Sequence, residues 1–352
     1  MTDGREIIVA RRRLGEHCRD LLVAQGLSTG DALTVADSLV SAECRGTVSH
    51  GVARLPHYLE RLRRGSIQAR PAITVAREFG ATMLLDGGDG LGQVVNQRAV
   101  TEVTRLTRDH GCGWVSIRRN SHCGAMAYYG LQIAREEMVA IVFTHSDSLV
   151  LPHGARQKYQ GTNPICVAAP GEGDEVFCLD MATSAVPWNR VMNARQRGDS
   201  IPAGVAVDAA GRDTTDPHRA VALHAAGGHR GSGLGLAIDM LCSMLGGAPF
   251  GIHIPIMYGD LDSPRELGGL VGAIDIRAFA EPAEFRRRVS AWMAEIRALP
   301  ADDHSPRVLA PGDPEATADM ANSQSLAIPP TTLAALNAEA SRAGLPPLAA
   351  CE

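Results

Sequence analysis

The middle of this chain alternates short apolar runs with helical stretches, and this alternation restricts the fold more than any other feature of the sequence. The helical stretches are residues 93–111 and 124–138, and they separate runs that are bounded by Gly, Pro, Asp or Asn, as strands usually are. The strand-like runs are ATMLLDG (81–87), CGWVSI (112–117), VAIVFT (139–144), PICVAAP (164–170) and EVFCLDM (175–181). We therefore predict an α/β lobe over residues 73–284.

Both ends of the chain have helical periodicity instead. At the N-terminal end the predicted helices cover residues 5–25, 28–44 and 52–64, and Ser28 is placed to cap the second of them. At the C-terminal end they cover residues 285–299 and 331–344. We predict that residues 1–72 and 285–352 together form a helical lobe, with the C-terminal helices folded back onto the N-terminal ones.

Composition and charge exclude several classes of protein. The net charge of -5 argues against a nucleic-acid partner, because proteins that bind nucleic acids are usually basic. Eight cysteines without a CxxC pair predict reduced thiols and no metal site. No apolar run approaches the roughly 20 residues that cross a membrane, and the N-terminus does not read as a signal peptide. We expect a soluble, cytoplasmic protein without a membrane partner.

A glycine-rich segment, GSGLGL at residues 231–236, resembles a dinucleotide-binding fingerprint only in part. No apolar strand precedes it, and its third glycine comes one position early, so it does not predict a Rossmann domain. The glycines allow either of two interpretations: close packing of the helix, or the approach of a phosphate to the helix N-terminus.

Polar loops next to the predicted strand ends carry the candidate chemistry. In SHGVARLPHY (49–58), His50, Arg54 and Tyr58 are four residues apart and would share one face of a helix. An arginine can bind a carboxylate through two parallel hydrogen bonds, and a histidine can transfer a proton. The alternative is an amphipathic helix with a polar surface. A metal site at His122 and Cys123 is disfavoured because adjacent residues rarely bind one ion.

Seven segments, taken in order, resemble one family over nearly the whole chain. They are SHGVARLPHY, NSHCGAMAYY, GTNPICVAAPGEGDE, DMATS, IPAGVAVDAAGRDTTDP, GLGLAIDMLCSMLGGAPFG and PGDPE. The family is that of the type-2 malate/L-lactate dehydrogenases, which also includes ureidoglycolate dehydrogenase, diketogulonate reductase and Δ1-piperideine-2-carboxylate reductase. The segments GEGDE, NARQR and MYGDL, with Trp188, most resemble the ureidoglycolate branch.

The resemblance implies a fold and an activity. The fold is a non-Rossmann, mixed-sheet NAD(P)-binding lobe inserted in a helical lobe built from both chain ends, and the chains pair as homodimers. The activity is hydride transfer between the nicotinamide of NAD or NADP and a small 2-hydroxy or 2-oxo acid of the ureidoglycolate, malate or lactate type. The alternative within the family is reduction of a cyclic imine acid.

The resemblance also assigns roles to residues. His122 and His50 compete for the role of proton carrier, since different branches assign it to one or the other. The substrate positions are Ser49, Arg54, Tyr58 and Thr162, with Arg54 binding the carboxylate. The cofactor positions are Ser146, Asn163, Asp180, Met181, Ala182, Arg190, Arg230, Pro311, Gly312 and Asp313.

Two departures from the usual family pattern concern the cofactor positions. GHRGSGL stands where GYKGYGL is usual, so Arg230 replaces a lysine, and Asn189 with Arg190 replaces a Gly-Lys pair. Arginine keeps the charge but has a planar fork of donors in place of a point charge. These departures leave the choice between NAD and NADP open. They also motivate an alternative of another class, an inactive binding or assembly protein on the same fold.

Overall fold

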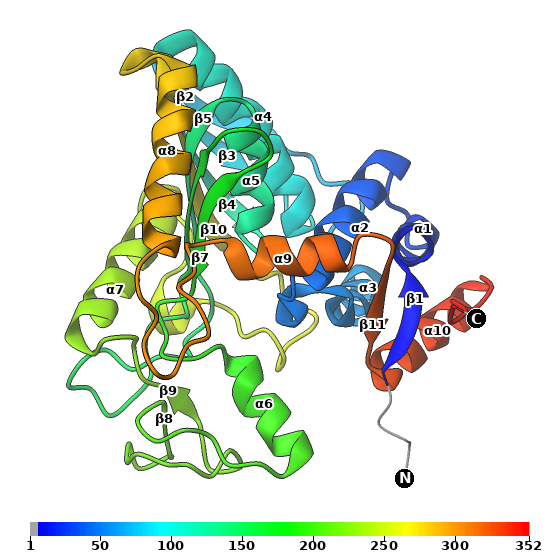
Figure 1. The fold of residues 1–352 in the computed structure, drawn as a ribbon. Coiled ribbons are helices and arrows are strands. Elements are labelled where there is room, and N and C mark those ends of the chain that lie inside the picture. Colours follow the sequence, from blue (N-terminus) through cyan, green and yellow to red (C-terminus); the bar gives the residue numbers. More distant parts are fainter. Residues whose placement is uncertain (1–5, 352) are drawn as a thin grey trace.

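The computed structural model describes residues 6–351, and a mixed sheet of seven strands is its centre (Figure 1). The strand order is β2-β3-β4-β10-β5-β6-β7, and only β3 and β4 pair in parallel. The strands are β2 (Thr74–Phe79), β3 (Thr82–Asp86), β4 (Cys112–Asn120), β5 (Met138–Thr144), β6 (Ile165–Pro170), β7 (Val176–Met181) and β10 (Leu267–Asp275). The strand-like runs of the sequence are confirmed, and the sheet is mixed as expected.

Helices cover both faces of this sheet, and alternation along the strands assigns each side chain to one face. On one face, α4 (Gly92–His110) and α5 (Ala127–Arg135) bury Val115, Val142 and Val271. On the other face, α7 (His229–Ser243) packs over Phe143 and Leu270 through Ile238 and Cys242. The glycine-rich segment therefore lies within a helix packed on a mixed sheet, outside any Rossmann unit.

Segments from both ends of the chain share one hydrophobic core, which includes Leu14, Leu39, Leu326 and Leu336. The helices of these segments are α1 (Arg11–Ala24), α2 (Thr29–Cys44), α3 (Leu55–Arg64), α9 (Asp313–Ala321) and α10 (Pro330–Ala343), and their grouping as one helical lobe stays a prediction. Strand β1 (Ile7–Ala10), which the periodicity predicted as helix, pairs antiparallel with β11 (Ser325–Ile328), and Figure 1 shows the two side by side. Ser28 caps α2 as predicted, since its side chain accepts a hydrogen bond from the backbone nitrogen of Asp31 at 3.1 Å.

Helix α8 (Pro282–Arg297) differs from the expectation that it would fold back onto the N-terminal helices. Instead it packs against β6. Its Trp292 stacks on Phe177 of β7 with ring centroids 5.3 Å apart, and the hydroxyl of Ser290 accepts a hydrogen bond from the backbone nitrogen of Glu172. The lobe boundary at residue 285 stays a prediction, and these contacts favour placing α8 with the sheet.

A third, smaller core lies beyond the end of β7. It is formed by α6 (Trp188–Arg197), the short strands β8 (Ala206–Val207) and β9 (Ala222–Leu223), and buried residues such as Val150 and Val191. No helix among residues 6–351 is both long and apolar enough to cross a membrane.

Candidate active site

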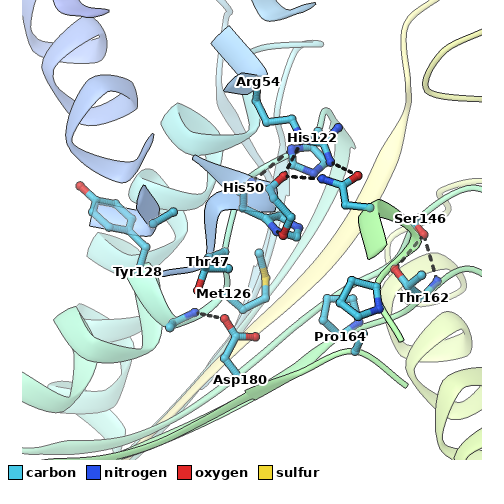
Figure 2. A pocket seen from close by; sticks show the side chains of 18 of the residues that line it. Thr47, His50, Arg54, His122, Met126, Tyr128, Ser146, Thr162, Pro164 and Asp180 are labelled. Atoms are coloured by element: carbon cyan, nitrogen blue, oxygen red, sulfur yellow. Dashed lines mark hydrogen bonds between the residues drawn. The ribbon is translucent and has the colours of Figure 1, made fainter. Parts of the chain in front are cut away.

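A cavity of about 280 Å³ lies between the helices of the N-terminal segment and the ends of several strands of the sheet (Figure 2). The 3-10 turns η1 (Val48–His50) and η2 (Val52–Arg54) contribute to it, as do the loop after β4 and the ends of β5, β6 and β7. The predicted site residues that line it are Ser49, His50, Arg54, His122, Ser146, Thr162, Asp180 and Ala182. Residues from segments far apart in sequence thus meet in one cavity.

His122 is held by a short loop that follows β4. The loop lies against the first residue of α4, where a Cβ on Gly92 would come within 2.5 Å of the carbonyl oxygens of Ser121 and His122. The backbone nitrogen of Gly92 also donates a hydrogen bond to the hydroxyl of Ser121 at 2.9 Å. Glycine at this position therefore permits the close approach that fixes the backbone of His122.

A buried hydrogen-bond chain extends behind His122. The hydroxyl of Tyr58 lies 2.6 Å from His122 Nδ1, and Gln93 Nε2 donates to the same hydroxyl at 3.3 Å. Tyr58 does not line the cavity; it lies behind the imidazole, with 1% of its surface exposed. The sequence placed Tyr58 among the residues that contact the substrate. In the structure His122 lies between Tyr58 and the cavity.

His50 lies beside His122 in the cavity. The two imidazoles stack with centroids 5.4 Å apart, and His50 Nδ1 shares a hydrogen bond with the hydroxyl of Ser49 at 2.8 Å. The loop that carries His50 is anchored from below by Glu43, which accepts a hydrogen bond from the backbone nitrogen of Val52 at 2.9 Å. A Cβ on Gly51 would lie 1.8 Å from the same carboxylate, so glycine is needed there.

Burial keeps both histidines neutral. It lowers the pKa of His50 from 6.5 to about 4, with a further contribution from the charge of Arg54. The pKa of His122 is also lowered well below 6.5, first by burial and then by its neighbours His50 and Arg54. Burial raises the pKa of the Tyr58 hydroxyl, which therefore keeps its proton. Near neutral pH both imidazoles in the cavity are therefore uncharged.

Arg54 is the cation of this cluster, and its guanidinium is fixed from several sides. Its Nε donates to the carbonyl of Ser49 at 2.6 Å, and Nη2 donates to Asn189 Oδ1 at 3.1 Å. Nη1 donates to the hydroxyl of Tyr258, and the guanidinium carbon lies 5.9 Å from the centre of that ring. A guanidinium held in this way is preorganised for a carboxylate.

The opposite end of the cavity has a different lining. Figure 2 shows Asp180, Met126 and Pro164 there, away from Arg54, with Ser146 and Thr162 at its side. Asp180 accepts a hydrogen bond from the backbone nitrogen of Ala127 at 2.7 Å, and burial raises its pKa to about 6. The side-chain oxygen of Asn163 accepts a hydrogen bond from the backbone nitrogen of Ser146 at 3.2 Å.

This end fits the nicotinamide dinucleotide that the family resemblance implies. Met126 and Pro164 offer apolar surface to a flat ring, and the hydroxyls of Ser146 and Thr162 offer groups that can both donate to and accept from a carboxamide. Asp180 and Glu315 could accept hydrogen bonds from sugar hydroxyls, and the cation of Arg45 could pair with a phosphate. The donor and acceptor set therefore matches the chemistry of the cofactor.

The other predicted cofactor residues lie outside the cavity lining. Asn163 supports Ser146 from behind, and Met181, Arg190 and Arg230 are exposed. The carbonyl of Pro311 accepts a hydrogen bond from the backbone nitrogen of Cys178, against which Gly312 packs. Asp313 accepts hydrogen bonds from Nε and Nη2 of Arg297, at 2.9 and 2.7 Å. Contact between these residues and the cofactor stays a prediction.

Several lining or supporting residues were not assigned to the site from the sequence. They are Gln93, Tyr258, Asn189, Arg45 and Glu315. A signal existed for two of them. Gln93 is a polar residue at a buried position of α4, and Asn189 occupies a place where the family usually has glycine. Among residues 6–351 no group of three or more His, Cys, Asp and Glu side chains is arranged to hold a metal ion.

Comparison with known proteins adds sequence and structural relatives. The family described as malate/L-lactate dehydrogenase matches residues 9–337. Ureidoglycolate dehydrogenase (NAD(+)) of Escherichia coli strain K12 is 37% identical over 291 residues, 83% of each protein. Sulfolactate dehydrogenase of Methanocaldococcus jannaschii has a TM-score of 0.90 and 32% identity, covering 96% of this chain and 98% of that one. Malate dehydrogenase of Pyrococcus horikoshii OT3 has a TM-score of 0.90 and 31% identity, covering 99% of each chain.

Proposed function

The chain belongs to the malate/L-lactate dehydrogenase family, and from that premise we propose that it interconverts a small 2-hydroxy acid and the corresponding 2-oxo acid at the cavity between its lobes. Enzymes of this family act on 2-hydroxy acids with NAD(+) or NADP(+). The observation that carries the proposal is the meeting of His122, His50 and Arg54 at one end of a cavity whose other end fits a nicotinamide. Ureidoglycolate, malate and lactate are the substrates proposed.

In the proposed reaction, Arg54 binds the substrate carboxylate. Its position beside the two imidazoles would place the neighbouring C2 hydroxyl next to them. His122 would take the hydroxyl proton during oxidation and return it during reduction. The nicotinamide supplies the acceptor or donor of hydride at its C4 when it is bound. The buried walls of the cavity would keep water away from the reacting carbon.

The choice of His122 over His50 as proton carrier rests on their partners. His122 Nδ1 contacts a buried tyrosine, and a ring nitrogen held by a buried hydroxyl leaves the other nitrogen free for the substrate. Among residues 6–351, the only hydrogen-bond partner of the His50 ring is the hydroxyl of the adjacent Ser49, which belongs to the same loop and lines the cavity. We assign His50 to the substrate wall, and it remains the alternative proton carrier.

The lowered pKa values predict how activity depends on pH. A histidine whose pKa is lowered is neutral above that value, so its ability to accept a proton is lost only as pH falls through it. We expect kcat/KM for oxidation to stay near its plateau down to pH 6.5 and to fall only at lower pH. Initial rates over a pH series would measure this, and a half-point at or above the ordinary histidine pKa of 6.5 would contradict the environment described for His122.

Two further features of the proposal concern assembly and location. Large apolar side chains are exposed on α7 and just after it, namely Leu234, Leu236, Met240, Met244 and Leu245, and we propose that a second copy of the chain covers them. A solution mass of twice 37.2 kDa is expected by light scattering, and a mass of one chain would exclude the homodimer.

Cytoplasmic location is proposed from the reduced cysteines, and fluorescence imaging of a tagged chain would test it.

Two alternatives can be separated from this proposal by one assay. The purified protein is mixed with NADH or NADPH, and the nicotinamide absorbance is followed with 2-oxo acids and with Δ1-piperideine-2-carboxylate. Turnover of a 2-oxo acid supports the proposal, whereas turnover of the imine alone indicates a cyclic imine reductase. Absence of turnover together with absence of cofactor binding by tryptophan fluorescence would indicate an inactive protein on the same fold.

A further inference from the structure

Gln93 is a buried polar residue whose hydrogen bonds are incomplete. It is the second residue of α4, and none of its surface is exposed. Its Nε2 donates to the hydroxyl of Tyr58, while its Oε1 has no hydrogen-bond partner among the described residues. A buried carbonyl oxygen without a partner is costly and calls for an explanation.

The hydrogen atoms along the chain from Gln93 to His122 can be assigned one by one. Because Gln93 donates to the Tyr58 oxygen, the single hydroxyl hydrogen of Tyr58 is free to point at His122 Nδ1. The backbone nitrogen of Gly124 also donates to Nδ1, at 3.4 Å. Nδ1 is therefore an acceptor, and neutral His122 carries its hydrogen on Nε2. In this form Nε2 cannot take a proton from a substrate hydroxyl.

A half-turn of the Gln93 carboxamide reverses the direction of the chain. Oε1 then accepts the hydroxyl hydrogen of Tyr58, and the Tyr58 oxygen accepts a hydrogen from His122 Nδ1. His122 Nε2 is left with its lone pair, which is the form that a base requires, and the same pattern serves the doubly protonated imidazole that follows proton transfer. In either orientation one atom of the carboxamide lacks a partner, so the turn costs the carboxamide itself no hydrogen bond. It does cost the long hydrogen bond from the backbone nitrogen of Gly124, because a protonated Nδ1 no longer accepts.

We propose that Gln93 is a positioning residue that determines, through Tyr58, which ring nitrogen of His122 carries the proton. Its side chain does not line the cavity, and Tyr58 lies between it and the imidazole. The inference rests on the proposed role of His122 as proton carrier. It deepens that role, since it makes the orientation of a carboxamide a condition for oxidation of the 2-hydroxy acid.

The variants Gln93→Met and Gln93→Glu test the inference. Methionine removes the acceptor that the Tyr58 hydroxyl needs in the base form, so we expect kcat for oxidation to fall about tenfold, with KM changed less than about twofold. A carboxylate only accepts hydrogen bonds, so Gln93→Glu should favour the hydrogen on Nδ1 of His122. Gln97→Met is the matched control, because Gln97 lies one turn further along α4 and donates to Gln132 Oε1 at 2.9 Å, away from the cavity.

The decisive readout is the ¹⁵N NMR spectrum of the histidine-labelled protein, in which the two ring nitrogens differ by tautomer. The His122 signals are identified by their loss in His122→Ala. We expect the Nε2–H form in the unsubstituted protein and in Gln97→Met, and a rise of the Nδ1–H form in Gln93→Glu. A changed tautomer ratio in either Gln93 variant supports the inference. Unchanged His122 signals in both variants would overturn it, as would an equal loss of kcat in Gln97→Met.

This experiment separates the inference from the proposed function. The spectrum requires no turnover, so the tautomer ratio is measured even if the proposed reaction is wrong. If His122→Ala abolishes turnover while the Gln93 variants leave the His122 signals unchanged, the proposed function stands and the inference fails.

Discussion

Replacing His122 with alanine should lower kcat for both directions of the reaction about 10²- to 10⁴-fold, the usual contribution of one general acid or base. The reason is that the imidazole would be the proton carrier, and the Tyr58 hydroxyl behind it keeps its own proton because burial raises its pKa. Cofactor affinity should change little, since Asp180, Ser146 and Thr162 lie at other parts of the cavity. Steady-state kinetics together with tryptophan fluorescence titration of NADH would measure both quantities.

Two further variants serve as controls for that experiment. His153→Ala removes an exposed imidazole outside the cavity lining and should leave kcat unchanged. His50→Ala removes the imidazole stacked on His122, and we expect a smaller loss of kcat than in His122→Ala. If His50→Ala abolishes turnover while His122→Ala retains most of it, the role of proton carrier belongs to His50.

Replacing Arg54 with alanine should lower kcat/KM for carboxylate substrates roughly 30- to 1,000-fold. This corresponds to a loss of about 2–4 kcal/mol of transition-state stabilisation. The loss should appear mainly in KM, because the proposed ion pair with the carboxylate is made in the ground state as well as in the transition state. Arg54→Lys should recover only part of the loss, since an ammonium cannot reproduce the planar fork that Ser49, Asn189 and Tyr258 hold in place.

A change of substrate provides the control for a general disturbance of the cavity. The amide of the same 2-oxo acid lacks the negative charge that Arg54 is proposed to bind, so Arg54→Ala should affect its slow turnover far less. Equal losses for acid and amide would mean that the variant disturbs the loop of Ser49 and would remove Arg54 from the carboxylate site.

Much of the fold was predictable because it depends on local patterns. The apolar runs that became β3, β4, β5, β6 and β7 have β-branched residues and turn residues at their ends, and Ser28 caps α2 as its spacing predicts. Strand β1 was not predictable, because Ile7–Ala10 is too short to show alternation and its partner β11 is more than 300 residues away in the sequence. The position of α8 depends on tertiary contacts such as Trp292 on Phe177, which the periodicity of the helix does not encode.

The candidate site shows the same division. The placing of His50 and Arg54 on one short segment follows from their spacing, and the family resemblance of the sequence alone singles out His122, Ser146, Thr162 and Asp180, all of which line the cavity. The hydrogen bond between Tyr58 and His122 was not predictable, because it joins α3 to the loop after β4. The hydrogen bond from Arg54 to the hydroxyl of Tyr258 was not predictable for the same reason, since the two residues are 204 positions apart.

The central claim is hydride transfer at this cavity, and isotope transfer tests it most directly. The protein is incubated with a 2-oxo acid and NADH or NADPH that carries deuterium at one face of C4, and the mass of the product is measured. One of the two facial isomers of the cofactor should give a 2-hydroxy acid with a single deuterium on C2, and His122→Ala should suppress its formation. A product without deuterium from both isomers, or no product with any of the proposed acids, would contradict the account.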